Sequence, residues 1–449
     1  MGYIPNTPDD MREMLASLGL KNIDELIAKA IPKDLLRKTP LDLPEPLSEY
    51  EALAEASSLA EDCADSNTMV CFMGAGAYDH YIPAIVHHIT SRPEFYTAYT
   101  PYQAEVSQGT LHAIFEFQSL IANLTAMDVA NASMYDGASA LAEAALLALS
   151  HTNRKKIIVG AHLHPNYLAV LKTYLHPSGA EIILAPAKGG ITDIEAPSKM
   201  VDANTAAVIV QNPNFVGCIE DGFAFKKTVE GKGALLIACV DPISLGMLTP
   251  PGKYGADIAV GEGQSMGIPL GFGGPYLGFF AAREEFVRRM PGRLIGASSD
   301  DNGTRGFVMT LQTREQHIRR DKATSNICTN EALCALAASV YLAIVGEQGL
   351  NHIANLCYQK AHYLAEKIEK EGFGKVVHKD PFFNEFLVEI KGDAESFVEK
   401  MALEGFLAGV PMSKLYPENK NQLLIAVTEK RSIEEMDDFV ETAIDIINL

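Results

Sequence analysis

Six short apolar runs between residues 155 and 282 constrain the fold of this chain more than any other feature. The runs are rich in Ile, Val, Leu, Phe and Ala, and helical segments separate them. Runs that are apolar throughout and alternate with helices are typical of a mainly parallel sheet covered on both faces. The sequence therefore predicts one large α/β domain with the strands KKIIV, AEIIL, AAVIV, ALLIA, ADIAV and GFFAA (155–159, 180–184, 206–210, 234–238, 256–260 and 278–282).

The N-terminal region, residues 1–65, predicts a peripheral helical arm. Thr7 can cap a helix with Pro8 in its first turn, and a second short helix is expected over 23–31. The apolar stripes of these helices need a cover. A neighbouring subunit or the chain's own body could supply it, and the sequence leaves both open.

The C-terminal region predicts a smaller α/β domain. A long helical stretch over 329–372, interrupted near Gly346, precedes strand-like segments at 382–390 and 422–428. Helix-like segments follow each of these strands. The predicted domains are accordingly 1–65, 66–325 and 326–449.

Charge and cysteine usage exclude several classes of function. The formal net charge is −20 and basic residues form no long block, so a nucleic-acid partner is not expected. The apolar stretches are too short or too polar at their flanks to predict a membrane span. The 7 cysteines are scattered without a CxxC pair, which predicts a cytoplasmic protein and no metal site. The first residues do not read as an export signal or a lipid-attachment motif.

Polar residues that follow the predicted strands are the first candidates for chemistry, because ligands of open α/β sheets bind beyond the carboxyl ends of the strands. His164 follows one strand, Gln211 to Asn214 end another, and Asp241 ends a third. Each is also an ordinary turn former or a hydrogen-bonding residue when taken alone. An acidic residue at a strand end, followed by a Ser- and Gly-rich turn, is nevertheless the layout of a pyridoxal-phosphate site. Asp241 would face the pyridine nitrogen and His164 the ring.

The turn that should carry the cofactor-binding lysine of such a site has none. In GEGQSMGIPL (261–270), the lysine position corresponds to Gln264 or Ser265. Neither an amide nor a hydroxyl can form an imine with an aldehyde. No lysine occurs between Lys253 and Lys322. Lys322 could substitute in a stand-alone enzyme, although its basic neighbours indicate a surface loop.

A tyrosine-rich segment, residues 96–108, precedes one of the predicted long helices. It brings several polar side chains together beside aromatic ones, a composition that favours an active-site wall or a subunit interface over simple packing. The candidates are Tyr102, Gln103, Glu105, Ser107 and Gln108.

Six motifs along the chain are long enough to be specific. They are YIPNTPDD, FMGAGAYDHYIPAIV, YTPYQAEVSQGTL, NASMYDGASALAEA, VGEGQSMGIPLGFGGPYLG and RDKATSNICTNEALCAL (3–10, 72–86, 99–111, 131–144, 260–278 and 320–336). With these motifs the chain closely resembles the α subunits, or subunit 1, of the two-subunit glycine dehydrogenase (decarboxylating), the P-protein of the bacterial glycine cleavage system. The resemblance extends along essentially the whole chain.

The resemblance implies a fold and a division of labour. The fold would be that of the fold-type-I pyridoxal-phosphate transferases, with a mainly parallel seven-stranded sheet, and the assembly an α2β2 heterotetramer. The β subunit would hold the cofactor, while the α chain would carry no covalent cofactor and no catalytic residue of its own. Together they would decarboxylate glycine and pass its aminomethyl group to the lipoyl arm of H-protein. A purely structural α subunit remains an alternative.

Overall fold

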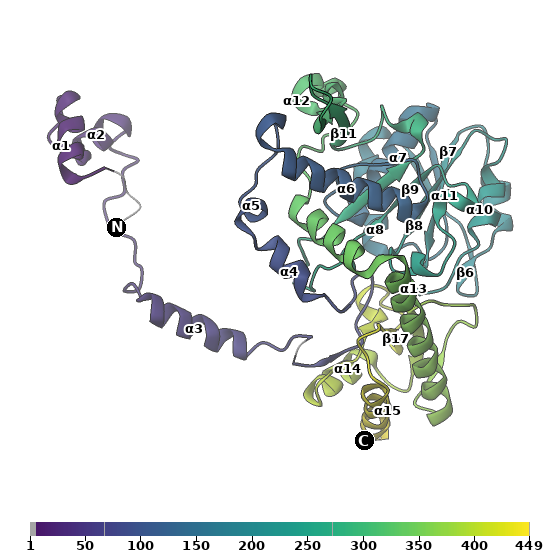
Figure 1. The fold of residues 1–449 in the computed structure, drawn as a ribbon. Helices are drawn as coiled ribbons and strands as arrows, with labels where there is room; N and C mark the ends of the chain where they lie inside the picture. Colours follow the sequence, from purple (N-terminus) through teal and green to yellow (C-terminus); the bar gives the residue numbers. More distant parts are fainter. Residues whose placement is uncertain (1–5, 67, 272, 449) are drawn as a thin grey trace. The chain divides into compact units, whose positions relative to one another are not determined.

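The computed structural model describes residues 6–66, 68–271 and 273–448. The chain divides into two units, Met1–Ala64 and Asp65–Leu449 (Figure 1). The arm predicted over residues 1–65 stays a prediction as a domain. The boundary predicted at 325/326, within the second unit, stays a prediction.

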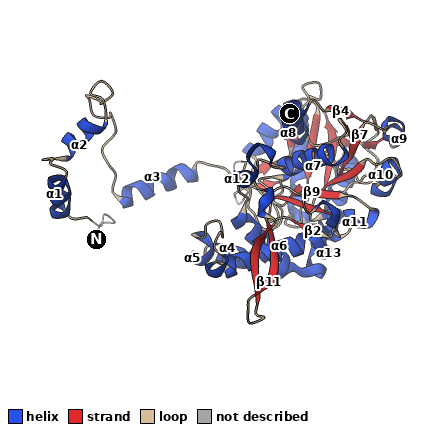
Figure 2. Ribbon diagram, turned by 90° about the horizontal axis from the view of Figure 1, so that it is seen from above, coloured by secondary structure: helices blue, strands red, loops and turns tan. Residues whose placement is uncertain are grey.

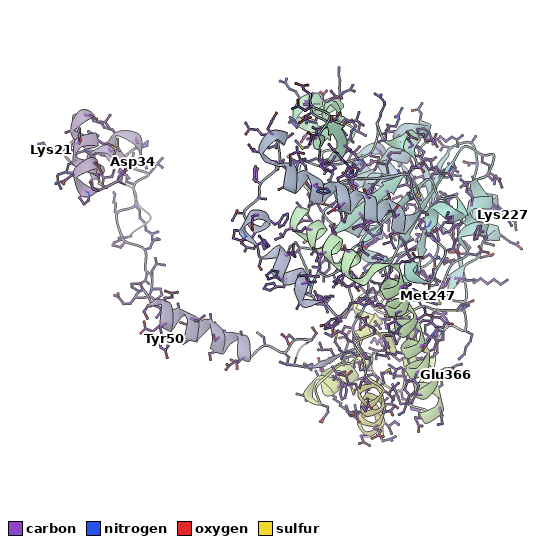
Figure 3. All side chains as sticks on the ribbon, viewed as in Figure 1. Lys21, Asp34, Tyr50, Lys227, Met247 and Glu366 are labelled. Carbon is purple, nitrogen blue, oxygen red and sulfur yellow. The ribbon has the colours of Figure 1, made fainter. Side chains whose placement is uncertain are left out.

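The N-terminal unit consists of three helices, α1 (Pro8–Ser17), α2 (Ile23–Ala30) and α3 (Glu49–Glu61). Thr7 caps α1 through a reciprocal capping box with Asp10, as the sequence predicted. Many large apolar side chains of this unit are exposed, and Figure 3 labels one of them, Tyr50 on α3. This unit therefore carries apolar surface that its own fold does not cover.

A seven-stranded sheet forms the centre of the second unit, in the order β2-β10-β9-β8-β7-β3-β4. The strands from β9 to β4 pair in parallel, and β10 pairs antiparallel with both β9 and β2. The sequence predicted this mainly parallel sheet, but not the short β2. The strands are β2 (Val129–Ala130), β3 (Lys156–Val159), β4 (Glu181–Leu184), β7 (Thr205–Asn212), β8 (Leu235–Val240), β9 (Ile258–Glu262) and β10 (Gly278–Ala282).

Helices cover both faces of this sheet because alternate residues of each strand point to opposite faces. On β7, Val208 and Val210 join one core with residues of α6, α10 and α13, whereas Ala207 and Ile209 join a second core with residues of α7 and α8. Figure 2 shows the strands between these helices. The helices are α6 (Gln108–Thr125), α7 (Gly137–Thr152), α8 (Pro165–Leu175), α9 (Glu195–Met200), α10 (Gly222–Val229), α11 (Pro251–Tyr254) and α13 (Ala332–Glu371).

Helix α13 runs from the central sheet into the C-terminal part of the chain (Figure 1). Its most apolar 18-residue window has a mean hydropathy of 1.5, so length and composition alone would allow a membrane span. However, 44% of that window is buried within the protein, and Gly346 interrupts the helix with non-helical dihedral angles. Residues of α13 also belong to two of the hydrophobic cores. These observations favour a core helix.

The C-terminal part forms a second sheet of four antiparallel strands, in the order β13-β14-β17-β16. Its core contains residues of α13, α14 and α15. The elements are β13 (Gly374–Val376), β14 (Glu385–Ile390), α14 (Ala394–Leu403), β16 (Val410–Pro411), β17 (Gln422–Ala426) and α15 (Ile433–Asn448). Strand β15 (Phe406–Leu407) pairs in parallel with β1 (Val70–Cys71), which lies far away in sequence.

Smaller elements complete the second unit. Before α6, the chain forms α4 (Ala84–Thr90) and α5 (Pro93–Tyr96). A hairpin of β5 (Ala187–Lys188) and β6 (Ile191–Thr192) follows β4, and a longer hairpin of β11 (Leu294–Ser299) and β12 (Arg305–Thr310) follows β10. The short helix α12 (Gln316–Arg319) precedes α13.

Gly217 lies where the turn after β7 packs against β14. Its φ is +83°, and a Cβ atom there would lie 1.7 Å from the backbone oxygen of Glu385. We expect Gly217→Ala to destabilise the protein by about 2–5 kcal/mol, since left-handed strain adds to the overpacking. Gly231→Ala is the matched control, because Gly231 has φ +70° and no heavy atom within 4 Å of such a Cβ. Equal losses in the urea midpoint for the two variants would contradict the role of the contact.

Candidate functional site

A pocket lies at the carboxyl ends of the central strands, where the sequence placed the candidate chemistry. We call it the strand-end pocket. It contains all four residues predicted from the strand ends and the turn: His164, Asp241, Gln264 and Ser265. Its remaining walls are Gly76, Tyr78, Tyr167, Gln211, Pro213, Asn214, Gly217, Cys239, Val240, Glu262, Asn384 and Glu385.

His164 lies at the N-cap of α8, and the protein itself engages its ring. The ring stacks on Tyr167 with centroids 4.9 Å apart, and Nε2 lies 2.8 Å from the carbonyl oxygen of Ala75. Burial lowers the pKa of His164 below its usual value. The face that was predicted to stack on a cofactor ring is thus in contact with a tyrosine.

Asp241 follows β8 and accepts hydrogen bonds from the backbone N–H groups of Ile243 and Ser244, at 2.6 and 3.1 Å. Burial raises its pKa, although these N–H groups and His80 oppose the shift. This geometry is that of a turn-forming aspartate that also lines the pocket. Both readings of the sequence therefore apply to it.

The side chain of Gln264 forms hydrogen bonds with the backbone of a segment that is distant in sequence. Its Oε1 accepts from the N–H of Tyr78 at 2.9 Å, and its Nε2 donates to the carbonyl oxygens of Tyr78 and Ile268 at 3.1 and 2.7 Å. The side chain at the expected lysine position thus forms hydrogen bonds with both the N–H and the carbonyl oxygen of Tyr78. The phenolic hydroxyl of Tyr78 in turn donates to Glu385 Oε2 at 2.9 Å across the pocket.

The carboxylate of Glu262 lies at the N-terminus of α7, where a helix can bind an anion. It accepts from the N–H of Gly137, at the start of α7, at 3.0 Å. It also accepts from the N–H groups of Gln264 and Leu277 at 3.1 and 2.8 Å. Helix N-termini bind phosphate through such N–H groups, and here the protein's own carboxylate engages one. Burial raises the pKa of Glu262 to about 8 against the effect of these donors.

The strand-end pocket does not fit pyridoxal phosphate. Its cavity volume of about 40 Å³ has room for about three water molecules. In the described part of the chain no lysine or arginine lines it, so it offers neither an imine-forming amine nor a cation for a phosphate. Its acidic residues, Asp241, Glu262 and Glu385, all have pKa values raised by burial.

Comparison with known proteins gives the family. The family model described as "Glycine cleavage system P-protein" matches residues 1–443. The chain belongs to the glycine cleavage system P-protein family. It is 53% identical over 441 residues to the "Probable glycine dehydrogenase (decarboxylating) subunit 1" of Carboxydothermus hydrogenoformans, covering 98% of this chain and 99% of that protein. It is 49% identical to the protein of the same name from Bacillus mycoides, with 98% of each chain covered.

Solved structures agree with this assignment to the P-proteins. The crystal structure of glycine decarboxylase (P-protein) in inhibitor-bound form matches with a TM-score of 0.92 and 44% identity, covering 99% of this chain and 100% of that one. Glutamate decarboxylase of Lactobacillus brevis matches with a TM-score of 0.69 at 14% identity, covering 92% of this chain and 95% of that one, and so shares the fold alone. The predicted fold class, that of fold-type-I pyridoxal-phosphate enzymes, is therefore confirmed.

The tyrosine-rich segment lies on the surface of this P-protein chain, away from the strand-end pocket. Tyr96, Tyr99 and Tyr102 are 69%, 82% and 58% exposed, and Gln103 and Glu105 are also exposed. Ser107 is half-buried at the start of α6. So large an exposed aromatic surface is typical of an interface, and the role predicted for this segment stays a prediction.

Gln108 belongs to the predicted set, but its side chain forms hydrogen bonds with the protein's own backbone. Its side-chain amide forms a pair of hydrogen bonds with the backbone of Phe307 on β12, both at 2.8 Å. Its Nε2 also donates to the carbonyl oxygen of Ala104 at 2.8 Å. Gln108 therefore fastens the β11–β12 hairpin to the tyrosine-rich segment.

Lys322, the alternative cofactor-binding residue, is exposed in a short turn after α12 and is not among the residues that line the strand-end pocket. The stand-alone enzyme is therefore not supported. The simpler reading of the sequence, a basic surface loop, fits this position.

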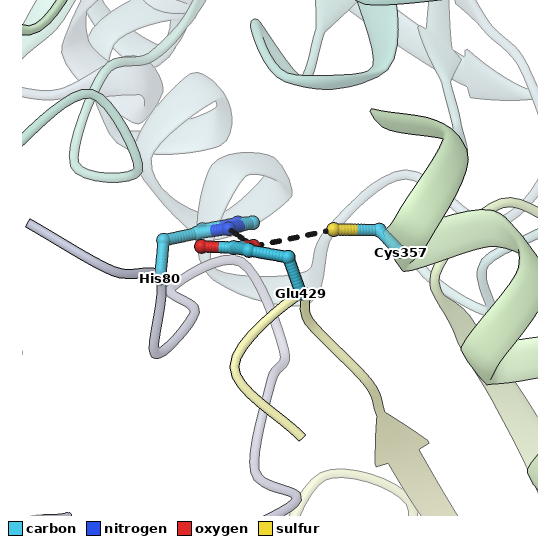
Figure 4. Close-up of side chains that lie close together, drawn as sticks. All are labelled: His80, Cys357 and Glu429. Atoms are coloured by element: carbon cyan, nitrogen blue, oxygen red, sulfur yellow. Dashed lines mark hydrogen bonds and ion pairs between the residues drawn. The ribbon is translucent and has the colours of Figure 1, made fainter. Parts of the chain in front are cut away.

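A buried histidine, glutamate and cysteine lie together outside the pocket (Figure 4). His80 Nδ1 lies 2.7 Å from Glu429 Oε2, and Cys357 Sγ lies 3.4 Å from the same oxygen. Their three ligand-type atoms fall within 4.8 Å of one another, which is the composition of a possible zinc site. The short His80–Glu429 contact instead describes a hydrogen-bonded ion pair. The expectation that the chain binds no metal stays a prediction.

Several pocket residues were missed from the sequence, and three of them make the contacts described above: Tyr78, Glu262 and Glu385. One signal was present for Glu262, a charged residue that ends an otherwise apolar strand, as Asp241 does. Glu385 begins β14 in the other sheet, and Tyr78 comes from the segment between β1 and α4. No local pattern connects these two with the pocket.

Proposed function

We propose that this chain acts as the subunit of glycine decarboxylase that does not hold the cofactor. A partner subunit holds pyridoxal phosphate, and the two chains together decarboxylate glycine. The relatives' name, glycine dehydrogenase (decarboxylating) subunit 1, supports both the reaction and the need for a second subunit. We further propose an α2β2 assembly in the cytoplasm, with the lipoyl arm of H-protein as the acceptor of the aminomethyl group.

The observation that carries this proposal is the strand-end pocket. The lysine position is occupied by Gln264 or Ser265. The side chains of Tyr78 and Glu385 form a hydrogen bond across the pocket, and the carboxylate of Glu262 accepts a hydrogen bond from the first N–H of α7. A chain with this pocket has the architecture of a pyridoxal-phosphate enzyme without a place for the cofactor. Its part in catalysis has to be exerted on a site outside this pocket.

The chemistry then divides between the two chains. Pyridoxal phosphate, when held by the partner, supplies a ring that accepts the electrons left by the departing carboxylate. This chain supplies surface: its exposed Tyr99 and Tyr102 can close over a partner's site, orient what enters it and exclude water. We therefore place the tyrosine-rich segment at the boundary between the subunits.

Reconstitution tests this proposal directly. The purified chain, incubated with an equimolar amount of pyridoxal phosphate and reduced with borohydride, should not retain one cofactor per chain on Lys322 or on any other single lysine, because no lysine of the described residues lines the strand-end pocket to form a specific imine. Glycine decarboxylation and glycine–CO₂ exchange should appear only when the partner is added. Reduced cofactor recovered at one molecule per chain on a single peptide of this chain would refute the proposal.

A structural role for the pocket residues follows from the same contacts. We expect Gln264→Leu to destabilise the protein by about 1–3 kcal/mol, because it removes the hydrogen-bond partner of the Tyr78 N–H and of the Ile268 carbonyl oxygen. The turnover number of the intact complex should stay unchanged. Thermal melts and initial rates on the same preparation separate the two effects. A loss of turnover at full assembly would instead indicate a functional pocket.

A further inference from the structure

A second cavity, with a volume of about 220 Å³, lies beneath the tyrosine-rich segment. We call it the arginine cavity. Tyr96 and Tyr99 line it from one side, and Thr329 and Asn330, just before α13, from the other. Arg293, the residue before β11, lines it as well. It shares no lining residue with the strand-end pocket.

Arg293 is a buried cation without a counter-charge. It is 8% exposed, and no carboxylate of the described residues lies within 4.0 Å of its guanidinium nitrogens. Its two protein acceptors are both neutral: Nη1 donates to Asn330 Oδ1 at 3.3 Å and Nη2 to the carbonyl oxygen of Cys328 at 2.7 Å. The guanidinium carbon also lies 6.0 Å from the centroid of the Tyr102 ring, which is a neutral partner as well. Buried charges in proteins are normally paired, so a buried guanidinium without a carboxylate partner indicates an anion from elsewhere.

The donors that remain on Arg293 suit an oxyanion. A guanidinium has five N–H groups, and two are used by Asn330 and Cys328, which leaves three. One of the three is on Nε, which is buried and has no hydrogen-bond partner among the residues that the structure describes. An Nε–H and a neighbouring Nη–H form the fork that binds two oxygens of a carboxylate or a phosphate.

The surroundings hold this fork in place. Asn330 Nδ2 donates to the carbonyl oxygen of Ala132 at 3.0 Å and to Ser133 Oγ at 2.9 Å, so the acceptor of Nη1 is itself fixed. Helix α13 begins at Ala332, which lines the arginine cavity together with Leu333. The N-terminal end of this long helix therefore lies beside the arginine cavity.

We propose that the arginine cavity binds a small oxyanion, either a carboxylate or a phosphate group, through the free N–H groups of Arg293. The cavity volume suits a small molecule or the end of a larger one. Its tyrosine wall continues into the exposed tyrosine-rich segment, so a bound ligand can project toward that surface. This site does not depend on which subunit holds the cofactor.

The test uses the chain purified in complex with its partner. Sodium acetate, glycine and inorganic phosphate are each added against sodium chloride at equal ionic strength, and the melting midpoint is recorded. A ligand that binds only the folded protein raises the midpoint with its concentration. We expect acetate and glycine, or phosphate, to do so for the unmodified complex and for the control Arg288→Gln, an exposed arginine of the same segment. Arg293→Gln should abolish this part of the shift.

The different ligands and variants distinguish a carboxylate from a phosphate group, and the paired N–H groups of arginine from a positive charge alone. A response to acetate and glycine assigns a carboxylate, and a stronger response to phosphate assigns a phosphate group. Arg293→Lys keeps the charge but loses the fork and should give a weaker response. It also carries the test if Arg293→Gln does not fold. Equilibrium dialysis with labelled acetate or phosphate should count one site fewer per chain in Arg293→Gln than in the unmodified complex or in Arg288→Gln. Equal shifts in the unmodified complex and the Arg293 variants, or no shift at all, would overturn the proposal.

Discussion

Replacing Glu429 with glutamine is expected to destabilise the protein by about 3–5 kcal/mol, the usual cost of breaking a buried ion pair from one side. The side chains of His80 and Glu429 are 2% and 9% exposed, and their atoms lie 2.7 Å apart. The second oxygen of Glu429 accepts from the N–H of Tyr81 at 2.7 Å. Without the carboxylate, a buried imidazolium is left unpaired, and the segment from β1 to α4 keeps only its other bonds to the turn after β17, such as the ion pair of Asp79 with Lys430.

The loss should depend on pH. Burial alone would lower the pKa of His80, but Glu429 raises it above the usual value. The stability from this shift is fully present below about pH 6.5 and is lost as the pH rises through the folded-state pKa. Burial likewise would raise the pKa of Glu429, and His80 lowers it instead. That contribution is present above about pH 4.5 and is lost in stronger acid. The difference from the unmodified protein should therefore be largest between about pH 4.5 and 6.5.

Urea midpoints at pH 5.5 and at pH 9 measure this effect, with exposed Glu418→Gln as the control. The control removes the same charge from the surface and should change the midpoint little at either pH. A parallel melt with a metal chelator separates an ion pair from a metal site, since Cys357 is also in contact with Glu429. A cost for Glu429→Gln that does not vary with pH, or a large destabilisation by the chelator, would contradict the ion pair.

The central sheet could be predicted because its inner strands are buried on both faces, whereas the edge strand β4 is exposed or half-buried. The run AAVIV of β7, for example, is buried at every position, and only a sheet covered by helices on both sides accommodates such a run. The hairpin of β11 and β12 was not predicted, since its residues are largely half-buried or exposed and carry no continuous apolar run. The pattern of apolar residues in a sequence indicates which segments are buried, and few residues of this hairpin are buried.

The candidate site could be predicted only in part, for a related reason. His164, Asp241 and Gln264 follow strands of one parallel sheet, so topology alone brings their positions to the same edge. The contacts that close the pocket connect Tyr78 with Gln264, 186 residues apart, and with Glu385, 307 residues apart. Arg293 likewise forms a hydrogen bond with Asn330, and a single sequence contains no pattern that predicts this contact. Contacts of this kind are set by how the two sheets pack, which local patterns do not record.

Tyr99→Ala combined with Tyr102→Ala is expected to weaken the association with the partner by at least about 30-fold, equivalent to one interface hot spot of about 2 kcal/mol. Both side chains are large, exposed and close to each other in a segment whose backbone Gln108 ties to β12. Exposed tyrosines on a fixed segment lose little conformational entropy on binding, which makes them effective anchors. Glycine decarboxylation should fall with assembly when the partner is limiting.

The decisive comparison is between binding and turnover. Phe223→Ala is the matched control, since Phe223 is an aromatic side chain of α10 that is 53% exposed and lies outside the tyrosine-rich segment. Titration of the partner, followed by sedimentation and by glycine–CO₂ exchange, gives the dissociation constant and the rate at saturation. If these tyrosines only join the subunits, the rate at saturation should recover fully. If they also wall the partner's site, as their exposure beside the arginine cavity suggests, a deficit should persist at saturation. Unchanged association and unchanged exchange in the double variant would remove the tyrosine-rich segment from both roles.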